Sequence, residues 1–216
     1  MAAGLAVITG AATGVGYFLA RLAAETGYDL VISDEDTLIY GTVSDCLHYG
    51  ADVLPVQACL STARGIDDLL EAVGDRPVDI ICAAPHLDDI GAIEGEPHGI
   101  APSAVGCSHL IRNMIELMIV GGRGRILLAS PRSAAAPATA DSALFLNRFA
   151  DSLRERLAGG GDSVTLTTLL LDPPVQPRGA EMGGSTATPD PAEAARLGWK
   201  ALAAGNPSII VRATHH

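Results

Sequence analysis

The stretch that decides the fold reads Leu5-Ala6-Val7-Ile8-Thr9-Gly10-Ala11-Ala12-Thr13-Gly14-Val15-Gly16. A short apolar run followed directly by closely spaced glycines and a helical pattern is typical of a buried strand that turns into a helix. Glycines at such a turn let the backbone bend tightly and approach a phosphate at the helix N-terminus. The stretch therefore predicts the first strand, loop and helix of a nucleotide-binding α/β fold.

Apolar runs and helical patterns alternate along the rest of the 216 residues, of which 48% are hydrophobic. This alternation predicts a single Rossmann-type domain over residues 1–216: three layers, with a doubly wound parallel sheet of about seven strands. We expect strands near Leu5–Ile8, Asp29–Ser33, Asp52–Gln57, Asp79–Cys82, Arg125–Ala129, Val164–Leu171 and Ser208–Val211. We expect helices near Gly16–Thr26, Leu38–Gly50, Gly65–Val73, Pro102–Ile119, Asp141–Leu157 and Pro191–Ala204.

Charge and cysteine content narrow the class of protein. A net charge of -11 argues against nucleic acid or an anionic membrane as a partner, because both need a basic face. No apolar stretch approaches the length of a membrane span, and the opening residues lack a basic leader. The four cysteines have no CxxC spacing, so we expect reduced thiols in a cytoplasmic protein.

An acidic residue follows the second expected strand. Asp34 stands about twenty residues after the glycines, where a carboxylate can accept hydrogen bonds from an adenosine ribose. Asp34, Glu35 and Asp36 would repel a 2′-phosphate, so the expected cofactor is NAD and not NADP. The alternative is that the loop is only a structural turn and the acidic triplet a solvated helix cap.

The pattern TGxxxGxG from Thr9 to Gly16 resembles the form used by the short-chain dehydrogenase/reductase family. Similarity continues in Val78–His86, Gly122–Ser130 and Leu171–Val175, which resemble the family's fourth strand, its fifth strand and the turn after its sixth. The resemblance implies a set of residues that bind the dinucleotide; with the glycine loop these are Gly10, Thr13, Gly14, Val15, Gly16, Asp34, Cys59, Leu60, Ala83, Ala84 and Pro85.

The residues that such enzymes use for catalysis are replaced. The family's serine, tyrosine, lysine and asparagine positions fall on Pro131, Leu144, Arg148 and Ser103. Every tyrosine precedes residue 50, and Lys200 is the single lysine, so a Tyr-x-x-x-Lys pair cannot exist in this chain. Proton transfer by a positioned side chain normally contributes about 10²- to 10⁴-fold to a rate.

Two hypotheses follow from these losses. The first is a non-catalytic or accessory subunit, a pseudoenzyme that keeps the dinucleotide-binding fold. The alternative is a non-standard NAD(H)-dependent oxidoreductase, or another enzyme in the same crevice, that uses Ser130, His86 or Arg148. The segment 175–190 is short for the family's substrate loop and leaves little material for a lid.

Helices 102–119 and 141–157 carry wide apolar stripes, including Leu110, Met114 and Met118. The resemblance implies that these helices form a dimer interface, either in a homodimer or in a heteromer with a related active subunit.

Two other constellations carry less weight. His86, His98 and the acidic residues between them lack the spacing of a known metal site, so no metal is expected. A hydrolytic triad with Ser130 and Asp172 lacks a GxSxG elbow.

Overall fold

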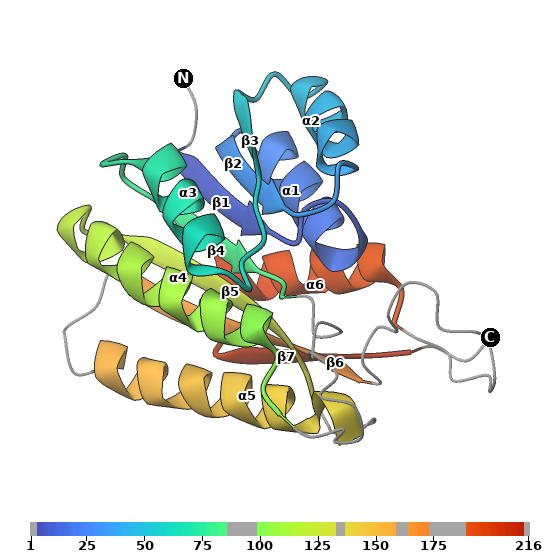
Figure 1. Cartoon of the computed structure of the whole chain (residues 1–216), viewed down its shortest axis with the longest axis vertical. Helices are drawn as coiled ribbons and strands as arrows, with labels where there is room; N and C mark the ends of the chain where they lie inside the picture. The colour runs from blue at the N-terminus through green and yellow to red at the C-terminus, as the bar shows by residue number, and fades with distance from the viewer. Residues whose placement is uncertain (1–3, 86–98, 133–136, 159–163, 173–188, 214–216) are drawn as a thin grey trace.

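The seven apolar runs form the seven strands of one parallel sheet, in the order β3-β2-β1-β4-β5-β6-β7 (Figure 1). The computed structural model describes residues 4–85, 99–132, 137–158, 164–172 and 189–213. The expected α/β fold of the Rossmann type is confirmed. The strands are β1 (Leu5–Thr9), β2 (Asp29–Asp34), β3 (Val53–Gln57), β4 (Ile80–Ala83), β5 (Gly124–Pro131), β6 (Val164–Asp172) and β7 (Ser208–Arg212).

Six helices cover the two faces of the sheet. They are α1 (Gly14–Glu25), α2 (Ile39–Leu47), α3 (Ala63–Val73), α4 (Pro102–Val120), α5 (Pro137–Ala158) and α6 (Pro191–Ala203). One face carries α1, α2 and α6, and the other carries α3, α4 and α5 (Figure 1). Each helical layer shares its own buried apolar cluster with the sheet. No helix in the described part of the chain is long and apolar enough to cross a membrane.

The central strand β1 fixes the position of the crevice. All five of its residues are buried, as expected for a strand that is covered on both faces. It pairs in parallel with β2 through Leu5↔Asp29 and with β4 through Ala6↔Ile80. The chain leaves β1 toward β2 and returns to β4 on the other side, so the strand order reverses at the carboxyl end of β1. Open α/β sheets bind their ligands at such a reversal.

Two element boundaries differ from the expectation. Strand β5 continues to Pro131, so Ser130 lies in the strand. Helix α5 begins at Pro137, four residues before the expected start at Asp141. Proline is favoured at the first helical position, because its fixed φ suits the helix and its missing N–H is not needed there. The other expected strands and helices have boundaries within three residues of those observed.

The apolar stripe of α4 is buried in the core of the protein. Leu110, Met114 and Met118 are fully buried in the cluster formed with α3, α5 and the sheet. These three side chains therefore do not contribute to the surface of α4, because the helix packs against α3, α5 and the sheet. What remains exposed on α4 is a smaller set that includes Val105, Ile119 and Val120.

Candidate functional site

The glycine loop turns at the carboxyl end of β1 in a conformation that requires glycine. Gly10 and Gly14 have φ values of +66° and +59°, in the left-handed region that side chains disfavour. A Cβ at Gly10 would lie 2.3 Å from the carbonyl oxygen of Ala84, and one at Gly16 would lie 2.1 Å from that of Gly10. The loop thus packs directly on the end of β4 and on the start of α1.

The helix that follows has a free N-terminus in the described structure. Thr13 is the N-cap of α1, but its side chain makes no capping hydrogen bond there. The first amides of α1 therefore have no side-chain partner from their own cap residue, and helix N-terminal amides bind phosphate oxygens. Val15 and Gly16 follow in the first turn, and both are buried.

Asp34 ties the glycine loop to the end of β2. Its carboxylate accepts hydrogen bonds from the backbone N–H of Ala12 at 2.9 Å and of Asp36 at 3.0 Å. Only 4% of the residue is exposed. The carboxylate that the sequence assigns to a ribose is therefore already bonded to backbone at both oxygens. Glu35, by contrast, is exposed.

A small pocket lies at the carboxyl ends of the four strands β1, β2, β3 and β4. Its cavity volume is about 30 Å³. Six expected residues line it: Gly10, Asp34, Cys59, Leu60, Ala84 and Pro85. The other expected residues, Thr13, Val15, Gly14, Gly16 and Ala83, lie in the loop, in α1 or within β4, outside this lining.

The pocket also contains polar residues outside the expected cofactor set. Thr9, Ser33 and Ser61 line it, together with Glu35 and with Ser103 at the family's asparagine position. The hydroxyl of Ser33 is buried and has no hydrogen-bond partner among the described residues. A serine within the apolar run of β2 was the available indication, since polar atoms in a buried strand normally need a partner.

Cys59 stands in this pocket as a neutral thiol. Burial, together with a hydrogen bond to Glu35, raises the pKa of the Cys59 thiol. A protonated thiol is a weak hydrogen-bond donor, so the pocket presents an uncharged, weakly polar group at this position.

The positions expected to replace the catalytic residues lie at the carboxyl end of β5, in α5 and, for Ser103, at the start of α4. Leu144 is 60% exposed, and Arg148 one turn later is also exposed. Ser130 is buried, and its hydroxyl donates to the carbonyl oxygen of Pro131 at 3.3 Å. That oxygen also accepts a hydrogen bond from Asn147 Nδ2 at 3.3 Å, a residue that the sequence reasoning did not consider.

The tyrosines lie on the other side of the sheet from α5. Tyr17 in α1 donates a hydrogen bond to Asp45 at 2.6 Å, and Tyr28 packs edge-on against Trp199 of α6. Tyr40 and Tyr49 lie in α2 and just after it. The single lysine, Lys200, is in the last turn of α6. The arrangement leaves no phenol near the carboxyl end of β5.

The weaker constellations are not assembled in the described residues. Asp172 pairs with Arg132, and the Ser130 hydroxyl bonds to a backbone carbonyl, so these two side chains do not form part of a triad. No group of three or more potential metal ligands occurs in the described part of the chain. His86 and the acidic loop up to His98, and most of segment 175–190, lie outside the described residues.

Comparison with known proteins identifies solved structures that share this fold. No protein-family model matches the chain. The chain superimposes on a metagenomic short-chain oxidoreductase in complex with NADP, with a TM-score of 0.73 over 100% of this chain and 99% of that one, at 20% identity. A bulky-bulky ketone specific alcohol dehydrogenase from Comamonas testosteroni gives a TM-score of 0.79 over 96% and 85% of the two chains, at 17% identity.

Two further likenesses agree. A 3-oxoacyl (acyl-carrier-protein) reductase from Agrobacterium tumefaciens with NADP bound gives a TM-score of 0.73 over 99% and 95% of the chains, at 17% identity. In sequence, 1-deoxy-11-beta-hydroxypentalenate dehydrogenase from Streptomyces avermitilis is 32% identical over 80 residues, 36% of this chain. That match spans 30% of the dehydrogenase, less than a third of its length.

Proposed function

We propose that this chain, which has the fold of the short-chain dehydrogenases/reductases, is a dinucleotide-binding member of that family that acts as a non-catalytic or accessory subunit. The observation that carries the proposal is the exposed Leu144 on α5, at the position where the resemblance places the proton-transferring tyrosine. Leucine has no proton to exchange. Arg148 keeps a positive charge at the lysine position, where it can still bind a ribose hydroxyl.

A nicotinamide dinucleotide is the cofactor class that the fold supports, and NADP is named for relatives with this fold. For this chain we propose NAD(H). Asp34 and Glu35 place negative charge at the end of β2, and no Lys or Arg occurs in the sequence between Arg21 and Arg64 to hold a 2′-phosphate. When bound, the dinucleotide would supply or accept a hydride, and the glycine loop and the amides of α1 would hold its phosphates.

The pocket is small, with a cavity volume of about 30 Å³, so we expect it to widen when an adenine ring enters. Cys59 and Leu60, in the loop after β3, line the pocket with Ser33 and Ser103, and we expect that loop to move when the pocket opens. In the same step the Asp34 carboxylate would share one of its oxygens between Ala12 and the ribose. Both requirements favour a modest affinity over a tight one.

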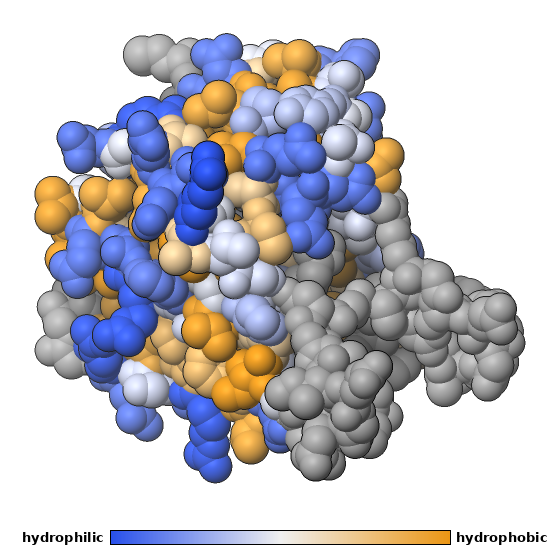
Figure 2. Space-filling model, viewed as in Figure 1, coloured by the Kyte–Doolittle hydropathy of each residue, from blue (hydrophilic) through white to orange (hydrophobic). Residues whose placement is uncertain are grey.

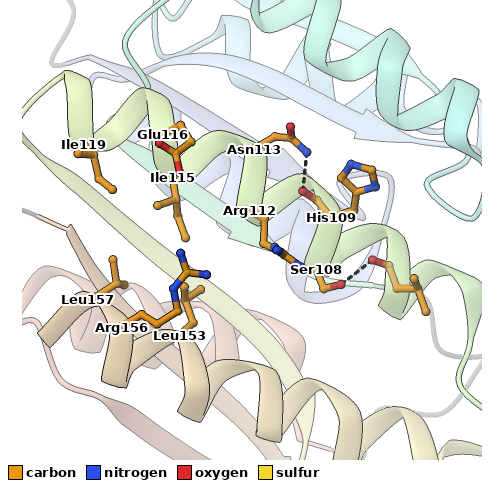
Figure 3. Close-up of a pocket in the computed structure, with 11 residues that line it drawn as sticks. Ser108, His109, Arg112, Asn113, Ile115, Glu116, Ile119, Leu153, Arg156 and Leu157 are labelled. Atoms are coloured by element: carbon orange, nitrogen blue, oxygen red, sulfur yellow. Dashed lines mark hydrogen bonds between the residues drawn. The ribbon is translucent and has the colours of Figure 1, made fainter. Parts of the chain in front are cut away.

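The accessory role also needs a partner surface, and we propose the face formed by α4 and α5. A groove of about 610 Å³ lies between these helices. Apolar side chains from both helices, Ile115, Leu153 and Leu157 among them, point toward one another in it, and Arg156 reaches from α5 toward α4 (Figure 3). This surface is suited to a second copy of the chain or to a related active subunit.

Calorimetry with the four dinucleotide forms tests the proposal. We expect NAD(H) to bind and NADP(H) to bind more weakly, with no turnover of simple alcohols or ketones by the unmodified chain. Leu144→Tyr combined with Arg148→Lys restores the pair, and any activity gained should be absent from Leu144→Phe with Arg148→Lys. Robust turnover by the unmodified chain would overturn the proposal in favour of an enzyme that uses Ser130, His86 or Arg148.

A further inference from the structure

The carboxyl edge of the sheet is charged differently at its two ends. At the end of β2 lie Asp34 and Glu35. Three to five strands farther along, the ends of β5, β6 and β7 place Arg132, Asp172 and Arg212 next to one another. Because all seven strands are parallel, both groups lie at the ligand-binding edge.

Backbone hydrogen bonds hold this second group in place. The N–H of Arg132 donates to the carbonyl oxygen of Leu171 at 2.9 Å, and that of Ala213 donates to the carbonyl oxygen of Asp172 at 3.2 Å. The register pairs Asp172 with Arg212 directly. The ladder of the sheet therefore continues past the strand ends, and the three charged side chains start from a fixed backbone.

One carboxylate oxygen serves both guanidinium groups. Asp172 Oδ2 lies 2.6 Å from Arg132 Nη1 and 4.0 Å from Arg212 Nε. A single carboxylate neutralises one guanidinium, so these three described residues carry a net charge of one positive unit. The arginines are also accessible, with 41% and 66% of their side chains exposed. Each guanidinium carries five N–H donors, and among the described residues Asp172 is the carboxylate that pairs with them.

We infer that this group, the β5–β7 arginine site, binds the anionic group of a small-molecule ligand, a carboxylate or a phosphate monoester. Guanidinium groups recognise both through paired, charge-assisted hydrogen bonds. The chain has a net charge of -11, so most of its surface repels anions. A positive site at the ligand-binding edge is therefore the place where an anion is attracted. A ligand that occupies the crevice would then point its anionic end toward β6 and its uncharged end toward β1.

The site does not depend on dinucleotide binding, so the two ideas fail separately. The test is a titration of the ¹⁵N-labelled chain, followed by ¹H–¹⁵N correlation spectra, with malonate, inorganic phosphate and the neutral ester dimethyl malonate. We expect saturable shifts of the Arg132, Arg212 and Ala213 amides with one or both anions and none with the ester. Saturating NAD should leave these shifts in place.

Arginine variants locate the binding. Arg132→Gln and Arg212→Gln should each weaken anion binding by about tenfold. Arg123→Gln is the matched control, because Arg123 forms the same kind of exposed pair with Asp79 at the opposite, amino-terminal edge of the sheet. The inference is overturned if neither anion gives saturable shifts, if the ester binds equally, or if Arg123→Gln weakens binding as much as Arg212→Gln.

Discussion

At the scale of single residues, Asp34 acts first on the protein itself. Its two backbone hydrogen bonds join the glycine loop to β2, and the Thr42 hydroxyl donates a further bond from α2 to the carbonyl oxygen of Ala11 at 2.8 Å. Asp34 is thus a positioning residue for the loop as well as the proposed source of selectivity against a 2′-phosphate.

Replacing Asp34 with alanine should therefore reduce stability even without a ligand. The substitution leaves the Ala12 and Asp36 amides without their acceptor, at a cost of about 1–3 kcal/mol in the free energy of unfolding. Glu35→Ala is the control, since Glu35 is exposed and should change stability by less than about 0.5 kcal/mol. Urea denaturation measures both. Equal stability of the two variants would show that the loop is held by other contacts.

The buried thiols make the stability of the folded protein fall at alkaline pH. Burial raises the pKa of Cys46 from its ordinary value of 9.0 to about 11 and that of Cys107 to about 12, and it also raises the pKa of Cys82. Above pH 9 the unfolded chain releases these protons while the folded chain retains them. Because the folded state then binds more protons, stability is complete below pH 9 and falls as the pH rises toward 11.

Denaturant midpoints measured from pH 8 to pH 10.5 should show this decline, and the triple variant Cys46→Ala, Cys82→Ala, Cys107→Ala should show a shallower slope. The comparison uses slopes, because removing three core side chains lowers the absolute stability at every pH. If the two slopes coincide, the decline comes from other titrating groups.

At the scale of elements, the shape of the small pocket around Cys59 and Leu60 depends on how closely α4 approaches the loop after β3. A Cβ at Gly106 of α4 would lie 1.8 Å from the carbonyl oxygen of Leu60. Gly65 of α3 makes a similar approach, since its Cβ would lie 2.1 Å from the carbonyl oxygen of Cys59. Two helices thus press glycines against the backbone of the pocket wall.

Gly106→Ala should push Leu60 away and cost about 1–3 kcal/mol of stability, together with a loss of dinucleotide affinity. Gly41→Ala in α2 is the opposite case, since a Cβ there meets no atom within 4 Å. It should stabilise the chain by about 0.5–1 kcal/mol, because glycine is unfavourable within a helix. Thermal unfolding and calorimetry of the two variants give the comparison; similar effects on both would contradict the proposed contact.

At the scale of the whole molecule, local patterns were sufficient to predict the layers. Most strands are centred on a short apolar run, so their positions could be read from the sequence. The edge of the sheet that carries the site could also be predicted, because parallel strands all end at the same edge and open α/β sheets bind their ligands there. The backbone bonds of Asp34 and the burial of Met114 could not be predicted, because each depends on which neighbour packs against it. The start of α5 and the buried Ser33 did carry local signals, a proline at the first helical position and a polar residue in an apolar run.

Association is a property of the whole molecule, and the proposed α4–α5 face can be tested directly. Over this side of the molecule, hydrophobic and hydrophilic side chains are interspersed (Figure 2). Ile119 lines the groove and is 53% exposed, so Ile119→Asp should abolish association without loss of fold. Leu54→Asp is the control, because Leu54 is exposed on the edge strand β3. Light scattering at micromolar concentration measures the molar mass of the unmodified chain and of both variants. Unmodified chain that is monomeric, alone and with a related active subunit, would contradict the proposal.

The central place of β1 has a consequence for how the protein is made. The ribosome synthesises β1 first, but the strand that covers its second edge, β4, begins only at Ile80. At a synthesis rate of about 5–20 residues per second, that edge stays open for on the order of ten seconds. During this interval the nascent chain displays an unpaired strand with four consecutive apolar residues, the kind of edge to which other chains add. Slow translation before Ile80 would prolong the exposure, and the yield of folded protein would fall with it.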